Sequence, residues 1–262
     1  MPDFSHRAGA AALFAIPVAA IASPAMAADD SDNYVQFGLG VDYSKGDYGD
    51  TQDTEILAVP ASVKVKHGDF TIRASLPYVR VKGPGSVVPG DGGAIPGGTI
   101  GPVTTTDGIG DLSLAAGYTL PVGKNTFLDL SARVKVPTAS ETKNLGTGTT
   151  DVTAQAEVTQ VFGPVSASVR GGRRFNGSNV RFPLRDVWQA GGSLYYQAGA
   201  VTVGADYDWR KGSLPTARDR SELTGSVSYK LNDKLRLQGY AYTGFTDGSP
   251  NAGGGLQVVF RL

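Results

Sequence analysis

Few side chains in this chain of 262 residues have the type and spacing needed for acid–base or nucleophilic chemistry. There is no cysteine, and the only histidines are His6, in an apolar leader, and His67, beside a Gly-Asp turn. A serine hydrolase needs a base close to its nucleophile, most often histidine. Asp206 and Asp208 share one face of an expected strand, but their spacing alone does not make an acid-pair protease. We expect the chain not to be an enzyme.

Metal, nucleotide and nucleic-acid chemistry are not indicated either. The carboxylate-rich segment from Asp42 to Asp53 offers oxygen ligands of the kind that Ca²⁺ prefers, but its spacing matches no known binding loop. The segment beginning Gly108-Ile-Gly-Asp lacks the third glycine and the following helix of a dinucleotide site. The chain has 24 basic and 24 acidic residues, and this balance gives no indication of the basic surface that nucleic-acid-binding proteins usually have. We predict no metal, no cofactor and no nucleic-acid partner.

Charged side chains do recur at alternate positions inside apolar stretches, most clearly from Asp107 to Thr138. Every second residue is apolar from Leu112 to Leu120 and again from Leu128 to Val136, with Pro-Val-Gly-Lys-Asn between them. A period of two predicts strands with one apolar and one polar face. Strands of about ten residues with charges at mid-strand are typical of outer-membrane barrels.

The same alternation continues from Tyr34 to Leu262 and predicts about twelve strands in about six hairpins. Long connections alternate with short ones throughout. Outer-membrane barrels have short periplasmic turns and long external loops, whereas a soluble sandwich has no reason to sort its loops in this way. We therefore predict an all-β, closed antiparallel transmembrane β-barrel of about 12 strands in the cell outer membrane.

Two segments interrupt the pattern. Near Pro77 the apolar positions change parity, because Val79 and Val81 replace the earlier set, and we expect a β-bulge there. The stretch from Gly83 to Thr106 is low in complexity and has no periodicity, so we expect a long, mobile loop. A loop of this length that folded inward would fill part of the barrel.

The first residues have the features of a secretory signal peptide. Arg7 precedes an apolar run of about fifteen residues, which ends at the small residues Ala25 and Ala27. A membrane anchor would need about twenty apolar residues, and this run also contains Pro17. We predict a signal peptide over residues 1–27 and a barrel over 28–262. Cleavage removes one acidic and one basic residue, so the remainder stays neutral.

The polar faces of the expected strands supply candidate pore-lining residues. These are Arg73, Asp111, Asp129, Arg133, Glu157, Arg170, Tyr195, Asp206 and Tyr240. Glu157 lies on a strand between those that carry Arg133 and Arg170, which suggests a ladder of paired charges. Buried charges persist only when they are paired or hydrated. A hydrated ladder would line a narrow channel, whereas a tightly paired one would fill a structural barrel.

The apolar faces carry aromatic residues near both predicted ends of the barrel. They are Tyr43, Trp188 and Trp209 at the external end, and Tyr118, Tyr196, Tyr229 and Phe260 at the periplasmic end. Trp188 and Tyr196 lie on one strand, roughly 20 Å apart in height, which approximates the spacing of two aromatic girdles in lipid. Apolar residues alternate up to Leu262, so we expect the barrel-assembly machinery to recognise this last strand.

Three motifs resemble one outer-membrane family. Gly108-Ile-Gly-Asp-Leu opens a strand, Arg133-Val-Lys-Val-Pro-Thr ends another, and Leu145-Gly-Thr-Gly-Thr-Thr-Asp follows. Together they resemble the barrel family named after the phenol meta-cleavage (MetA) pathway, although a glycine commonly follows Pro-Thr there and this chain has Ala139. The resemblance implies a transporter that passes small solutes, including hydrophobic or aromatic ones, passively. The alternative is a non-conducting structural or adhesive barrel that acts through its external loops.

Overall fold

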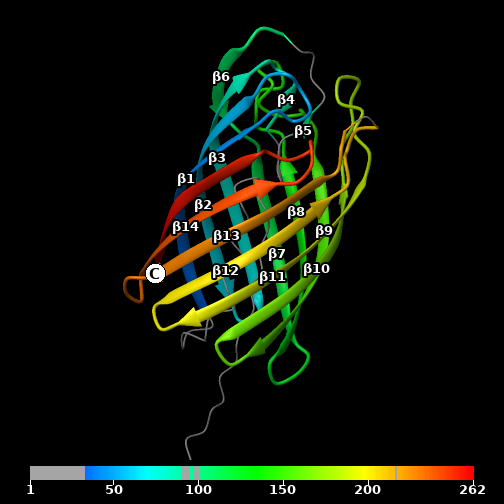
Figure 1. The fold of residues 1–262 in the computed structure, drawn as a ribbon. Helices are drawn as coiled ribbons and strands as arrows, with labels where there is room; N and C mark the ends of the chain where they lie inside the picture. The colour runs from blue at the N-terminus through cyan, green and yellow to red at the C-terminus, as the bar shows by residue number, and fades with distance from the viewer. Residues whose placement is uncertain (1–32, 90–94, 97–100, 216) are drawn as a thin grey trace, which may run out of the picture.

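The computed structural model describes residues 33–89, 95–96, 101–215 and 217–262, and the predicted signal peptide lies outside them. The strands form an antiparallel sheet that closes when the first pairs with the last (Figure 1). Its members are β1 (Asn33–Gly46), β2 (Thr54–His67), β3 (Phe70–Gly83), β6 (Thr104–Ile109), β7 (Leu112–Pro121), β8 (Thr126–Val136), β9 (Asp151–Phe162), β10 (Val165–Phe175), β11 (Val187–Ala198), β12 (Val201–Arg210), β13 (Arg220–Lys230), β14 (Leu235–Gly244) and β15 (Ala252–Arg261).

The wall has twelve strand positions, because β6 and β7 pair with successive parts of β3 and share one position. This confirms the predicted closed barrel of about 12 strands. A separate pair, β4 (Val87–Val88) and β5 (Ile95–Pro96), lies at the end of the barrel that bears the long loops. The part of the chain that the structure describes contains no helix long and apolar enough to cross a membrane.

Side chains alternate between the outside and the inside along each strand. The outward set is apolar and exposed, for example Leu39, Ile72, Val169, Leu194 and Leu256. A soluble monomer rarely exposes contiguous apolar surface of more than a few hundred Å². An apolar surface that runs around the whole wall therefore requires a lipid environment.

Connections at one end of the barrel are short, and those at the other end are long. Two of the short turns place Gly163 and Gly199 at φ of +58° and +60°, where a side chain would be strained. The long loops cover residues 47–53, 84–103, 137–150, 176–186, 211–219 and 245–251. By the rule for outer-membrane barrels, the short turns face the periplasm and the long loops face outward.

The structure changes two sequence-based expectations near Pro77 and Gly83: the bulge is wrong, and the long loop is shorter than expected. Strand β3 pairs with β2 in one unbroken register from Phe70 to Lys82, so it has no bulge. Val79 and Val81 instead keep the inward parity and are buried, because apolar loop residues cover them from inside. The loop expected from Gly83 to Thr106 ends at residue 103, since β6 begins at Thr104 and extends the wall beside β3. Residues 90–94 and 97–100 of this loop lie outside the described residues, so its expected mobility stays a prediction.

Candidate functional site

The inner face of the barrel is the candidate functional site, because it gathers the polar and charged side chains of every strand. Arg170 on β10 is the centre of one cluster. Its guanidinium donates hydrogen bonds to Asp208 Oδ1 from Nη2 at 2.7 Å and from Nε at 3.2 Å, and from Nη1 to Ser193 Oγ at 2.9 Å. Asp206 Oδ1 lies 3.9 Å from Nη1, and Oδ2 of Asp206 accepts the Tyr195 hydroxyl at 2.5 Å. These contacts tie three neighbouring strands together from inside.

The strand register supports one step of the expected ladder of Arg133, Glu157 and Arg170. Glu157 stands directly opposite Arg170, but its neighbour on β8 is Asp129, and Arg133 faces Thr153 instead. Asp129 and Glu157 are 6% and 3% exposed. Two adjacent buried carboxylates make the β8–β9 wall locally acidic.

Two tyrosines of β14 converge on Asp42 of β1. The Tyr240 hydroxyl donates to Asp42 Oδ2 at 2.9 Å, and the Tyr242 hydroxyl donates to Oδ1 at 3.1 Å. The two rings are nearly parallel, with centroids 6.3 Å apart. Between β14 and β1 runs β15, where a Cβ added to Gly255 would lie 2.5 Å from Tyr240 Oη and one added to Gly253 would lie 2.3 Å from Tyr242 Cζ. Both tyrosines therefore lie against the wall, across glycines.

Tyr195 of β11 lies against the neighbouring strand β12 in the same way, across a glycine. A Cβ added to Gly204 would lie 2.0 Å from its ring. Each of these three inner tyrosines thus occupies the space that a neighbouring strand leaves by carrying glycine. Because the rings lie against the wall and do not project inward, the lumen is wider than it would otherwise be. These glycines therefore influence the width of the lumen.

A buried ion-pair network closes the inner face near the long loops. Lys135 on β8 is 1% exposed, and its ammonium lies 3.2 Å from Asp111 Oδ2 and 3.0 Å from Asp151 Oδ2. It also donates to Thr147 Oγ1 at 2.8 Å, and Arg174 donates to Asp151 Oδ2 at 2.6 Å. Thr147 belongs to loop 137–150, Asp111 lies between β6 and β7, and the other three residues lie on β8, β9 and β10, so the network anchors this loop to the barrel.

The glycine-rich motifs have a packing role in the same region. A Cβ added to Gly108 would lie 2.9 Å from Leu145 Cδ1, and one added to Gly146 would lie 2.7 Å from Ala139 Cβ. The Ala139 amide donates to Asp111 Oδ1 at 3.0 Å. The motifs that carry the family resemblance therefore join loop 137–150 to the wall, and Asp111 serves that junction.

The start of the loop after β3 folds inward. Val87 packs in an apolar cluster that includes Tyr48, Val79 and Val81. Val88, its neighbour, is fully buried in a second cluster. The other members of this second cluster are Phe182, Leu184 and Leu214, with Ala217 packed against it. Burial also raises the pKa of the Tyr48 phenol. Residues 87 and 88 thus join two apolar clusters at the external end, where sequence reasoning expected only a mobile loop.

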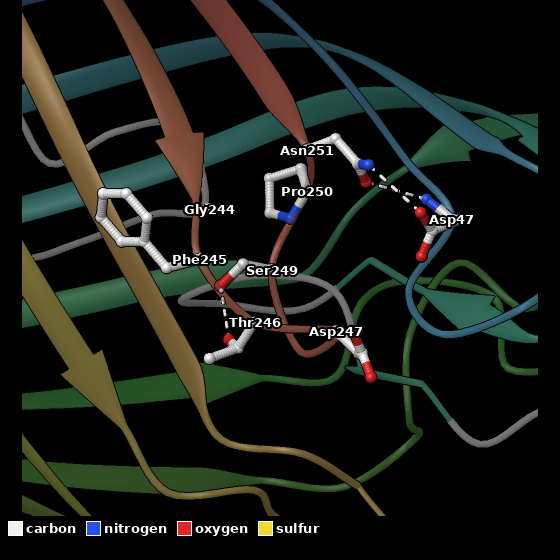
Figure 2. A pocket seen from close by; sticks show the side chains of 8 residues that line it. All are labelled: Asp47, Gly244, Phe245, Thr246, Asp247, Ser249, Pro250 and Asn251. Carbon is white, nitrogen blue, oxygen red and sulfur yellow. Dashed lines mark hydrogen bonds between the residues drawn. The ribbon is translucent and has the colours of Figure 1, made fainter.

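A pocket of about 250 Å³ opens at the external rim between the β14–β15 loop and Asp47 (Figure 2). Asn251 Nδ2 donates to Asp47 Oδ2 at 3.1 Å, and Asn251 Oδ1 accepts the Asp47 amide at 3.1 Å. The Gly49 amide also donates to Asp47 Oδ1 at 2.8 Å. These bonds hold the pKa of Asp47 below its ordinary value. The pocket's polar groups bind one another, so it is a loop junction.

All the candidate pore-lining residues have the parity of the inner face. They are Arg73 on β3, Asp111 between β6 and β7, Asp129 and Arg133 on β8, Glu157 on β9, Arg170 on β10, Tyr195 on β11, Asp206 on β12 and Tyr240 on β14. The structure brings Arg170, Tyr195 and Asp206 together. Their role in lining a pore stays a prediction.

The candidate girdle residues have the opposite parity. Tyr43, Trp188 and Trp209 lie near the long-loop ends of their strands, and Tyr118, Tyr196, Tyr229 and Phe260 lie near the short-turn ends. The rings of Tyr118 and Phe70 are 4.5 Å apart at the short-turn end. That these aromatic side chains form girdles at the two lipid interfaces also stays a prediction.

The candidate list omitted several inner residues that the structure makes prominent. Asp42 occupies an inward position of the first strand. The alternation of polar and apolar residues in that strand was the signal that could have identified it as an inner-face residue. Lys135 and Arg174 likewise have inward parity and charge, but nothing in their spacing indicates a shared network. Among the described residues no group of three or more acidic, histidine or cysteine side chains could hold a metal ion.

Solved structures similar to this chain share its outer-membrane barrel fold. The COG4313 outer membrane channel from Pseudomonas putida F1 matches with a TM-score of 0.67 at 15% identity, over 89% of this chain and 97% of that one. The NanC porin matches with a TM-score of 0.56 at 8% identity, over 86% and 100%. The translocator domain of the autotransporter NalP from Neisseria meningitidis matches at 0.53 and 13%, over 89% and 90%. No curated protein sequence matches.

These likenesses, with the apolar outer face, identify the chain as a barrel of the outer membrane. A family model described as "Putative MetA-pathway of phenol degradation" matches residues 28–262. The resemblance of the three sequence motifs is therefore confirmed, and the chain belongs to that family.

Proposed function

We propose that this protein is a channel that lets small solutes pass the outer membrane passively. The observation that carries the proposal is the polar inner face of a closed barrel, where charged groups such as Arg170, Asp206 and Glu157 line the wall. Charges in a barrel interior are stable when they pair or stay hydrated, and a hydrated lumen conducts. The similar COG4313 channel and NanC porin support this assignment.

The solute class follows from the family. Its description refers to phenol degradation, which favours small aromatic compounds. Tyr195 and Tyr240, which belong to the candidate pore lining, are 5% and 8% exposed, so their rings form part of the wall. We propose that small solutes pass along the charged inner face, and that the barrel itself carries out no chemistry on them.

A non-conducting barrel is the second candidate, and one observation favours it. The segment with Val87 and Val88 packs inward between apolar clusters at the external end, as a closure would. In that case the external loops would carry the function. We regard the segment as a constriction of the channel mouth, because the inner face below it is charged rather than packed with apolar side chains.

Maturation and membrane insertion complete the proposal. Residues 1–27 would be removed as a signal peptide, which leaves 28–262 as the barrel. The aromatic girdles would then sit at the two lipid interfaces. The alternating apolar residues of β15, from Leu256 to Leu262, would be the feature that the barrel-assembly machinery binds.

The test is conductance of the refolded barrel, residues 28–262, in planar bilayers. Discrete current steps that phenol partly blocks are the expected result. Steps that phenol does not affect would leave a general pore and remove the aromatic solute class. A folded barrel without steps, verified by its heat-dependent mobility on gels, would overturn the channel and favour the structural candidate.

A further inference from the structure

Cations gather on one side of the lumen towards the periplasmic end. They lie on β14 and β15 and on β2 and β3, two pairs of strands that flank β1, and they are Lys64, Lys66, Arg73, Arg236 and Arg261. The parts of these strands nearest the short turns, residues 33–40, 61–67, 70–77, 235–240 and 256–261, contain no aspartate or glutamate. Closure of the barrel between β1 and β15 is what brings these cations onto one wall.

The strand register places three of these cations and a glutamine side by side. Arg73 stands opposite Lys64, Lys64 opposite Gln36, and Gln36 opposite Arg261. Tyr34 lies within the same group, with the Arg261 guanidinium carbon 4.3 Å and the Lys64 ammonium 5.5 Å from the centre of its ring. The wall thus presents a compact set of hydrogen-bond donors.

Lys64 is the residue that points to a ligand. Its side chain is 95% removed from solvent, since 5% remains exposed. Among the described residues its ammonium has no carboxylate within ion-pair distance and no hydrogen bond, and its contact is with the Tyr34 ring. The nearby charges of Arg73, Lys66 and Arg236 repel it, and the carboxylate of Asp129 on β8 attracts it. A buried ammonium among like charges is costly unless an anion joins it.

The wall from β8 to β12 carries a group of carboxylates. Asp129 and Glu157 adjoin on β8 and β9, and Asp206 and Asp208 follow on β12, where Arg170 of β10 forms ion pairs with both. A small solute between the walls therefore meets a transverse field, and its anionic group turns towards Lys64 and Arg73.

We propose that Lys64 and Arg73 form a binding site for the carboxylate of a small organic anion on its way through the lumen. Arginine and lysine both form charge-assisted hydrogen bonds to carboxylates, and the flanking Tyr34 ring accommodates a planar group beside them. The inference rests on the proposed channel function and deepens it, because it makes aromatic carboxylates, rather than neutral phenols, the preferred solutes.

The experiment compares benzoate and phenol as blockers of single-channel current, with reversal potentials measured in a salt gradient. In the unmodified barrel we expect anion preference and benzoate block at lower concentration than phenol. Lys64→Gln should weaken benzoate block about tenfold, which is the usual worth of a charged hydrogen bond, and should leave phenol block unchanged. The control Lys124→Gln removes an exposed charge from the β7–β8 turn and should change neither.

Equal benzoate block in Lys64→Gln and the unmodified barrel would overturn the site. Calorimetric titration of the refolded barrel with benzoate separates this result from failure of the channel itself. If no current is seen but benzoate binds and Lys64→Gln abolishes the binding, the result supports the binding site and contradicts the channel function. If Lys64→Gln does not fold, Lys64→Arg should fold and retain benzoate binding, and loss of binding in that variant would overturn the site.

Discussion

Arg170 and Asp208 are joined by two hydrogen bonds although a whole strand, β11, lies between their own strands. The register places Gly191 of β11 directly between them. A Cβ at Gly191 would lie 2.8 Å from Arg170 Nε and 2.6 Å from the Tyr207 carbonyl oxygen. The missing side chain is therefore what lets the guanidinium cross the strand.

Gly191→Ala should break this crossing. The new methyl group displaces the Arg170 side chain and crowds the backbone of β12, so we expect a loss of roughly 1–3 kcal/mol in the free energy of unfolding. Urea unfolding in lipid vesicles measures it. Gly225→Ala is the matched control, because a Cβ there meets nothing within 4 Å. Equal stabilities of the two variants would contradict the crossing.

Lys135→Met should destabilise the barrel more strongly. It removes the cation between Asp111 and Asp151 while both carboxylates stay buried, which typically costs roughly 3–5 kcal/mol. The temperature at which the folded band is lost on heated gels should fall. Lys143→Met changes an exposed lysine of the same loop and should leave that temperature unchanged. A small effect of Lys135→Met would mean that the loop is anchored by other contacts.

Gly204→Ala and Gly253→Ala should narrow the lumen. In each case the added methyl group takes the place of a tyrosine ring, Tyr195 or Tyr242, and the ring must turn inward. Single-channel conductance should fall in both variants. The double variant Gly253→Ala with Tyr242→Ala should recover it, because no ring remains to be displaced. A conductance that Gly253→Ala leaves unchanged would show that the ring has another place on the wall.

Val87→Asp should open the external mouth. A carboxylate at this fully buried position cannot stay in the apolar cluster with Tyr48 and Val81, so the segment should leave it. We expect a higher conductance and faster proteolysis of loop 84–103. Val180→Asp, at a wholly exposed position of another long loop, is the control. An unchanged current would place this segment outside the solute path.

The carboxyl group of Asp47 should titrate below its ordinary pKa of 3.8. The Gly49 amide and the Asn251 side chain both donate to the ionised form, so this loop junction is stabilised at neutral pH. The contribution is present above the unfolded pKa and disappears as pH falls through the lower, folded pKa. NMR titration of the carboxyl carbon in micelles measures this, and Asn251→Ala should raise the pKa.

The pKa of Asp233 offers an internal control for that titration. Its ion pair with Lys230, 2.9 Å away, also lowers its pKa, but it lies in a turn at the opposite end of the barrel. Asn251→Ala should therefore leave the titration of Asp233 where it was. A parallel shift of both groups would indicate a general change in fold rather than the loss of one hydrogen bond.

Alternation along the chain was sufficient to predict the barrel and the faces of its strands. The sequence position of residues such as Leu114 and Arg133 shows which face of the sheet each side chain lies on, because successive side chains of a strand point to opposite faces. The alternation gave the wrong face for Val79 and Val81. These apolar side chains point inward, because an apolar loop inside the barrel covers them. No local pattern reveals that cover, since Val87 reaches it only in the folded chain.

The details of the candidate site depend on cross-strand register, which the sequence does not contain. Glu157 and Arg133 looked like partners on neighbouring strands, yet the register sets Asp129 beside Glu157. Nothing in the sequence distinguishes Gly191 and Gly204 from other strand glycines, whereas in the structure each makes room for a side chain of a neighbouring strand. Such relations follow from the offset between strands and from the tilt of the wall.

The pairing of β1 with β15 has a consequence for how the molecule reaches its native state. The seam joins the two ends of the described chain, from Gln36 with Arg261 to Lys45 with Ala252. Contacts so distant in sequence form late and slowly, because most of the chain must be ordered before they can stabilise anything. Until that moment β1 and β15 are both open edges, able to pair with another molecule. The last step of folding is therefore also the step at which aggregation competes.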